Sequence, residues 1–190
     1  MKLHRTQKLP QRHALIAGIS LLEMVVAVGL IAILAMVAVP SYQSVIEKNR
    51  VVRLTDEVHG FLLQAKSEAV MKNDRLKIKL IRDDTPAVNT EYRDGMWILA
   101  LLLESSTASD ISSAKAEAMS ILDGDAFKNT GLSVTSLEVV VEPVRGVFSN
   151  NLSAIITNNL EASTTVKVSN ISGRISICSQ QGSYGYVECV

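Results

Sequence analysis

The sequence is poor in the residues that build metal and redox sites. Its 190 residues include only two cysteines, Cys178 and Cys189, and only three histidines. Two thiols cannot complete a four-cysteine zinc site, and His59, the one histidine after residue 18, lies far from both thiols in the sequence. We recognise no nucleophile with a paired base, no phosphate-binding loop and no metal-ligand cluster. We therefore expect a protein that is not an enzyme and that holds no cofactor or metal.

An excess of positive charge is also missing. Lys+Arg and Asp+Glu both number 19, so the formal net charge is zero. Residues 1–18 are basic and contain no acid, and without them the chain has 15 basic and 19 acidic residues, a net charge of −4. This balance excludes a globally cationic nucleic-acid-binding protein and leaves room only for a local basic patch.

One long apolar run dominates the N-terminal part. Residues 19–39 read ISLLEMVVAVGLIAILAMVAV, in which Glu23 is the only charge. A run of this length can span a bilayer core of about 30 Å as a helix, and the basic residues before it favour a cytoplasmic flank. An ordinary secretory signal has a shorter apolar stretch with the small cleavage-site residues after it. Here Gly18 precedes the run, so cleavage after Gly18 would keep the apolar helix.

The string GISLLE (residues 18–23), behind its basic leader, resembles the class III signal of type IV prepilins. In that family a glycine precedes the cut and a glutamate stands at mature position five. If Ile19 is the first mature residue, Pro40 falls at mature position 22, where pilins typically carry a helix-kinking proline. The resemblance implies that a prepilin peptidase cleaves between Gly18 and Ile19 and that the new Ile19 amine is N-methylated.

The resemblance also gives Glu23 a part in assembly. A carboxylate in an isolated membrane helix costs roughly 2.5–3.5 kcal/mol near the bilayer centre. Pairing with the N-terminal amine of a neighbouring subunit would lower that cost, because two buried opposite charges are less costly together than apart. A glutamate at the membrane interface is the alternative interpretation. The implied partners are other major and minor pilins and the inner-membrane assembly platform, and the implied location is a single-pass inner-membrane protein with a periplasmic head.

The rest of the chain predicts an α+β head behind a long helix. Apolar residues recur at helical spacing as far as Ala69, and Asn73-Asp74 is a stop signal, so we expect a helix over 20–72 that Pro40 bends or loosens. Residues 19–39 would form the membrane or filament-core part, residues 40–72 the amphipathic continuation, and residues 73–190 a mainly antiparallel β head, as in the pilin fold.

Period-two alternation in the head predicts its strands. Residues 104–131 are polar and broken, with a short helix expected over 114–122. The expected strands lie at 75–80, with a basic outer face, and at 95–103, 132–144, 153–157, 164–169 and 174–178.

Short motifs in the head resemble the FimT/GspH branch of minor pilins and pseudopilins. They are a Gly-x-Trp strand at 95–97, Arg145-Gly146, and a closing Gly173-Arg174 turn that leads into a strand. Pilin heads face the periplasm or the exterior, where disulfides persist. We therefore expect a Cys178–Cys189 disulfide that closes the C-terminal loop, worth about 3 kcal/mol, with two free thiols as the alternative.

Two sets of residues are candidates for DNA binding. FimT-type competence pilins carry a Gly-Arg-x-Arg motif that is associated with DNA binding; Gly173 and Arg174 match it, but Ser176 replaces the second arginine. The alternative is a purely structural turn. A second basic set consists of Lys72, Arg75, Lys77, Lys79 and Arg82, of which residues 75, 77 and 79 share one strand face. The alternative is that such a run is only the solvated side of a strand. Asp123-Gly124-Asp125 suggests a calcium-binding loop, but Val134 stands at loop position twelve, where such a loop carries a glutamate. We therefore interpret this segment as a turn.

Together these features predict a minor pilin that helps to assemble or initiate a type IV pilus and takes part in DNA uptake during natural transformation. The first alternative is a GspH-type pseudopilin of a type II secretion system. The second is a DNA-binding receptor at the pilus tip.

Overall fold

The computed structural model describes residues 20–158 and 163–189. The chain divides into two units, with the boundary after Tyr42, and the second unit runs from Gln43 to Val190. Gly18 and Ile19, the predicted cleavage site, lie outside the described residues.

Helix α1 (Leu21–Lys72) begins and ends almost where the sequence predicts. Its first turn is capped by Ser20, whose hydroxyl oxygen accepts a hydrogen bond from the Glu23 amide at 3.1 Å. It ends before Asn73, which takes the left-handed conformation (φ 50°) that asparagine tolerates better than most residues. Pro40 falls within these bounds, among residues 37–41 whose side chains the structure does not describe, so a bend there stays a prediction.

The first unit carries a long apolar surface. The large apolar side chains between Leu21 and Met36 are 54% to 83% exposed on all sides of the helix. Glu23 is the one charged residue among residues 21–36. An exposed apolar surface of this extent marks a site of contact with other proteins or with lipid. Among the helices of the described residues, none is sufficiently long and apolar to cross a membrane.

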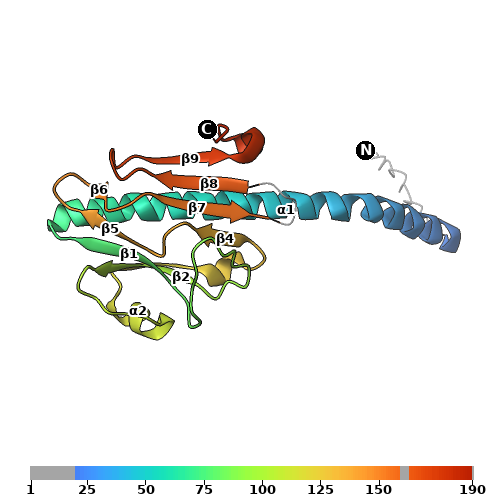
Figure 1. Ribbon diagram of the computed structural model, residues 1–190. Helices are drawn as coiled ribbons and strands as arrows, with labels where there is room; N and C mark the ends of the chain where they lie inside the picture. Colours follow the sequence, from blue (N-terminus) through green and yellow to red (C-terminus); the bar gives the residue numbers. More distant parts are fainter. Residues whose placement is uncertain (1–19, 159–162, 190) are drawn as a thin grey trace, which may run out of the picture. The chain divides into compact units, whose positions relative to one another are not determined.

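In the second unit, two antiparallel sheets cover the C-terminal half of α1 (Figure 1). One sheet has the strand order β3-β2-β1-β5-β6 and the other has the order β4-β7-β8-β9. The strands are β1 (Leu76–Ile81), β2 (Ile98–Leu103), β3 (Ser120–Asp123), β4 (Gly131–Val134), β5 (Glu138–Glu142), β6 (Val147–Phe148), β7 (Leu152–Thr157), β8 (Ser163–Val168) and β9 (Ile175–Ser179).

The main core lies between α1 and the inner faces of both sheets. Its helix residues follow spacings of three and four, which keeps them on one face. The members from α1 are Val51, Leu54, Val58, Phe61, Leu62, Ala65 and Ala69. Trp97, which lies just before β2, is fully buried in the same core, so it is a packing residue. Thr55 is also fully buried, and its hydroxyl is 2.5 Å from that of Thr164 in β8.

A second, smaller core lies on the outer face of the five-stranded sheet. Helix α2 (Ile111–Glu117) lies on this side of the sheet (Figure 1). Ala114 of α2 and Ala108, from the chain before it, pack on Ile98 and Leu102. Strand β2 is therefore buried on both faces, which explains its continuous apolar run. The helix predicted over 114–122 is wrong in position: α2 begins at Ile111, where Asp110 caps it, and β3 follows it.

The single strand predicted over 132–144 is also wrong. Here β4 and β5 belong to different sheets. Leu132 and Val134 point into the core from one sheet, whereas Val139 and Val141 point into it from the other. Even-numbered residues face inward before the break and odd-numbered residues after it, and a strand cannot change phase in this way without an interruption.

Candidate functional site

The predicted assembly residue, Glu23, lies exposed in the first turn of α1. A carboxylate is favourable there because the N-terminal end of a helix carries partial positive charge. The amine that would pair with it belongs to Ile19, outside the described residues. The pairing of Glu23 with a neighbouring subunit therefore stays a prediction.

The basic face of β1 is not a solvated surface, contrary to the sequence interpretation. Lys77 Nζ donates to the carbonyl oxygen of Ser106 at 2.8 Å, and Lys79 Nζ donates to that of Ala108 at 2.7 Å. Lys77 is only 8% exposed. Both side chains point to the face that α2 and its preceding segment cover, so their ammonium groups fasten this cover to the sheet. DNA could reach them only by displacing those bonds.

Arg82, a member of the second basic set, is buried and holds the end of β1, a role that the sequence did not indicate. Arg82 forms hydrogen bonds with both Asp84 and Asp94, and its guanidinium lies over the Tyr92 ring at 4.2 Å. The hydrogen bonds from Arg82 lower the pKa of Asp94 to about 2 and that of Asp84 in the same direction, and the two carboxylates raise the pKa of Arg82. This cluster ties the loop over 84–94 to the sheet.

The predicted disulfide is confirmed: Cys178 and Cys189 are bonded, with Cα atoms 4.9 Å apart. It closes a C-terminal loop that also contacts α1, because the Tyr186 hydroxyl donates to Asp56 at 2.9 Å. Burial, and then the Asp56 carboxylate, raise the pKa of Tyr186 to about 12. The loop is therefore fastened both to β9 and to the helix.

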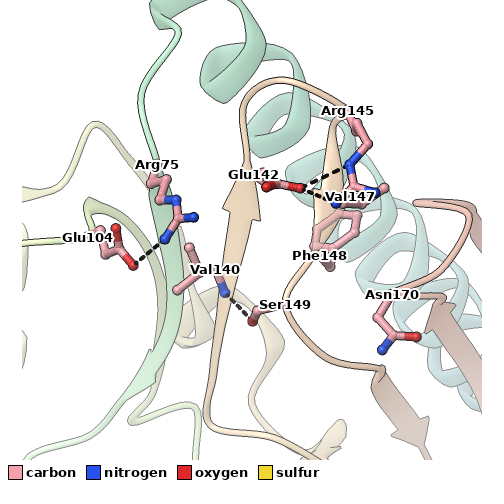
Figure 2. A pocket seen from close by; sticks show the side chains of 9 residues that line it. All are labelled: Arg75, Glu104, Val140, Glu142, Arg145, Val147, Phe148, Ser149 and Asn170. Carbon is pink, nitrogen blue, oxygen red and sulfur yellow. Dashed lines mark hydrogen bonds and ion pairs between the residues drawn. The ribbon is translucent and has the colours of Figure 1, made fainter.

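One surface groove, of about 350 Å³, lies at the end of the five-stranded sheet (Figure 2). Figure 2 shows two ion pairs beside it: Arg75 with Glu104 at 3.6 Å, and Arg145 with Glu142 at 3.0 Å. Since each cation already has an acidic partner, the groove carries no net charge from these four residues. It has no feature that favours a charged ligand.

A second groove, of about 380 Å³, is lined by Lys167 and by Arg174, which follows Gly173 in the predicted motif. Gly173 has φ 62°, and a Cβ there would lie 2.6 Å from the Gly146 carbonyl oxygen, so this glycine is required by the turn itself. Arg174 is exposed at the groove. The groove belongs to β7, β8 and β9, whereas Lys77 and Lys79 belong to β1 in the other sheet. The two predicted DNA-binding sets therefore do not form one patch.

Comparison with solved structures shows which fold this is: the α+β fold of the type IV pilins, as the sequence predicted. The crystal structure of the type IV minor pilin FimU of Pseudomonas aeruginosa in space group P21 matches with a TM-score of 0.53 and 16% identity, over 71% of this chain and 96% of that one. FimU in space group P65 matches with a TM-score of 0.48 and 15% identity, over 67% and 94%. No protein-family model matches the sequence, and no curated protein matches it. The narrower resemblance to the FimT/GspH branch stays a prediction.

Proposed function

We propose that this chain is a minor pilin, a subunit that helps to assemble or initiate a type IV pilus. The observation that carries the proposal is that the two parts of α1 have different surroundings. Its first part exposes an apolar surface with one carboxylate, Glu23, whereas its later part is the central element of the head core. A subunit built in this way buries its bare helix against the helices of other pilins.

Maturation follows from the motif at residues 18–23. A prepilin peptidase cleaves between Gly18 and Ile19, and the Ile19 amine is methylated. Before assembly the apolar segment holds the subunit in the inner membrane, with the head in the periplasm. The Cys178–Cys189 disulfide supports this location, because disulfides persist in oxidising compartments. The assembly platform then moves the subunit into the filament, where Glu23 pairs with the amine of a neighbour.

The test is incorporation into filaments in a piliated host. Glu23→Ala removes a carboxylate that is unfavourable in lipid, so membrane insertion should be unchanged or improved, while the amount of subunit in sheared pili should fall severalfold. Glu57→Ala is the matched control, since Glu57 lies on the same helix but outside the apolar part. Intact mass should show methylated Ile19 at the N-terminus. Normal incorporation of the Glu23 variant, or retention of residues 1–18, would overturn the proposal.

The same strains separate the pilus from a secretion system. Loss of the gene should reduce piliation and leave protein secretion intact. The reverse result, with secretion lost and pili normal, would assign the chain as a GspH-type pseudopilin of a type II secretion system.

DNA binding at the pilus tip is a second candidate function, and the groove beside Arg174 favours it. It holds Lys167 and Arg174 among serine and asparagine side chains. Because phosphate affinity grows with the number of neutralised charges, we expect a dissociation constant on the order of 10⁻⁴ M for duplex DNA, rising with salt. Arg174→Gln should weaken binding at low salt, whereas the control Arg145→Gln should not. If both variants bind DNA equally well, the groove beside Arg174 is not a DNA-binding site.

A further inference from the structure

We propose that the open edge of β9 accepts an extended segment of another protein as a fifth strand of the four-stranded sheet. This inference rests on the proposed pilin function only for the choice of partner. The evidence is the backbone geometry of β9, the contrast with the opposite edge of the same sheet, and the helix surface beside it.

The backbone groups of Ile175 and Ile177 point away from the sheet. At the end of β9, the Ser179 amide donates to the Val187 carbonyl, and the Ser179 carbonyl accepts from the Cys189 amide, so both groups face away from β8. In an antiparallel strand alternate residues direct both groups to the same side. Ile177 and Ile175 therefore present their N–H and C=O groups outward, and neither residue bonds to a further partner in the described part of the chain.

The opposite edge of this sheet is covered. There, Leu132 of β4 exchanges two backbone hydrogen bonds with Tyr92, at 2.9 and 3.0 Å, and the Val134 carbonyl accepts one from Asn89 at 2.8 Å. Folded proteins usually cover, shorten or charge their sheet edges to prevent unwanted pairing. Strand β9 reads Ile-Ser-Ile-Cys-Ser, with no charge and no proline. The part of its edge at Ile175 and Ile177 is therefore neither covered by another described segment nor protected by a charge or a proline within the strand.

Two contacts fix β9 alongside α1. Lys66 Nζ donates to the Gly173 carbonyl just before β9, and Tyr186, just after the loop that follows β9, bonds to Asp56. The strand therefore runs between the helix positions of Lys66 and Asp56. Leu63 lies on that flank, because residues three, four or seven apart share one helix face. Its side chain is 47% exposed.

Val70, seven residues after Leu63, lies on the same face of α1 and is 50% exposed. His59, which lies between Asp56 and Leu63 in the helix, is half-buried. Ile175 and Ile177 pack against the main core from the side of the strand and are only half-buried. An added strand would satisfy the outward backbone groups and shield these apolar side chains at the same time, as in recognition by strand addition.

The surroundings define the chemistry of the partner segment. Its inward side chains must be apolar, because they meet Leu63 and the two isoleucines. Its outward side chains must be polar and include a carboxylate, because Arg174 lies exposed at the start of β9. The partner is thus an extended segment that alternates apolar and polar residues, with an acidic residue opposite Arg174.

A second copy of this chain is a poorer partner than a different protein. Ile175 of one copy could pair with Ile177 of another, but a symmetric antiparallel pair would make the two α1 helices run in opposite directions. Pilin subunits anchored in one membrane need parallel helices. We therefore assign the edge to a segment of another protein.

The probe is an acetylated and amidated peptide, about seven residues long, that alternates valine with threonine and carries one glutamate. Binding is measured by fluorescence anisotropy with the full-length protein in detergent micelles. We expect a dissociation constant on the order of 10⁻⁴ M or tighter. Peptides N-methylated at alternate positions provide the matched control. Methylation on the side that faces β9 should weaken binding at least tenfold, and methylation on the other side should leave it unchanged.

Protein variants give an independent readout. Ile177→Pro removes the outward N–H and should abolish binding, whereas Ile177→Val keeps that N–H and should preserve it. No binding, or equal binding of both methylated peptides, would overturn the proposal. A dimer of the full chain that Ile177→Pro dissociates would overturn the assignment to another protein. Peptide binding needs no pilus, so its failure leaves the Glu23 filament test intact, and failure of that test leaves the open edge intact.

Discussion

The cluster around Arg82 gives a prediction with both a magnitude and a pH dependence. Arg82 is 5% exposed and forms hydrogen bonds with Asp94 at 2.9 and 2.8 Å and with Asp84 at 2.6 and 2.9 Å. Removing one partner of a buried, charge-assisted pair is costly because the other charge stays buried without compensation. The perturbations are Asp94→Asn, Arg82→Met and the double variant.

The expected losses follow from burial. Hydrogen bonds to charged groups contribute about 1.5–3 kcal/mol each. Asp94 is 35% exposed, and solvent screening lowers its share, so Asp94→Asn should reduce the free energy of unfolding by about 1 kcal/mol. Arg82→Met should cost about 3 kcal/mol, since it leaves two carboxylates without their cation and removes the contact with Tyr92. The double-mutant cycle should give a coupling of about 1 kcal/mol.

The pH dependence has a definite sign. The folded pKa of Asp94 is about 2, below its ordinary value of 3.8. Stabilisation by Asp94 is therefore fully present above about pH 4 and is lost as the pH falls toward 2. Urea unfolding of the wild type and Asp94→Asn at a series of pH values measures this. A difference between the two proteins that is as large at pH 2 as at pH 7 would refute an ionic role for Asp94.

Two further variants and reduction of the disulfide test other parts of the head. Gly173→Ala should lower the free energy of unfolding by about 1–3 kcal/mol, because it forces a side chain into a left-handed conformation against the Gly146 carbonyl oxygen; denaturant unfolding measures the loss. Reduction of the Cys178–Cys189 disulfide should cost about 3 kcal/mol or less and should first increase amide hydrogen exchange over 180–189. Lys79→Met should speed amide exchange in α2 and lower stability by about 1 kcal/mol, because the Ala108 carbonyl loses its donor.

The sequence predicted those elements whose side-chain pattern is strong and local. The bounds of α1 follow from apolar spacing and from Asn73, which can adopt the left-handed conformation at the helix end. The break between β4 and β5 was also visible in principle, as a change of phase between Val134 and Val139. The prediction missed it because no glycine or proline marks the turn between the two strands.

Other features depend on contacts between distant segments, which no local pattern records. The cover over β1 consists of small residues such as Ala108 and Ala114, whose spacing carries no strong periodicity. Lys77 and Lys79 therefore looked solvated, although carbonyl groups about thirty residues away in sequence bind them. The open edge of β9 was invisible for another reason: side chains reveal which face of a strand is buried, but not whether a neighbouring strand is present.

The contacts of the basic residues also bear on the choice between a structural subunit and a DNA receptor. Lys77, Lys79 and Arg82 are held by carbonyl or carboxylate groups of the head itself. Binding of a polyanion gains affinity from each cation that it can neutralise, and cations already paired inside the protein add little. Arg174 is left as the exposed cation of the predicted motif, and one arginine supplies only weak, salt-sensitive affinity. The same turn also sets the start of β9, whose outward backbone groups at Ile175 and Ile177 have no partner among the described residues and are available to a partner strand. The geometry at Gly173-Arg174 is therefore better matched to contact with another protein than to contact with DNA.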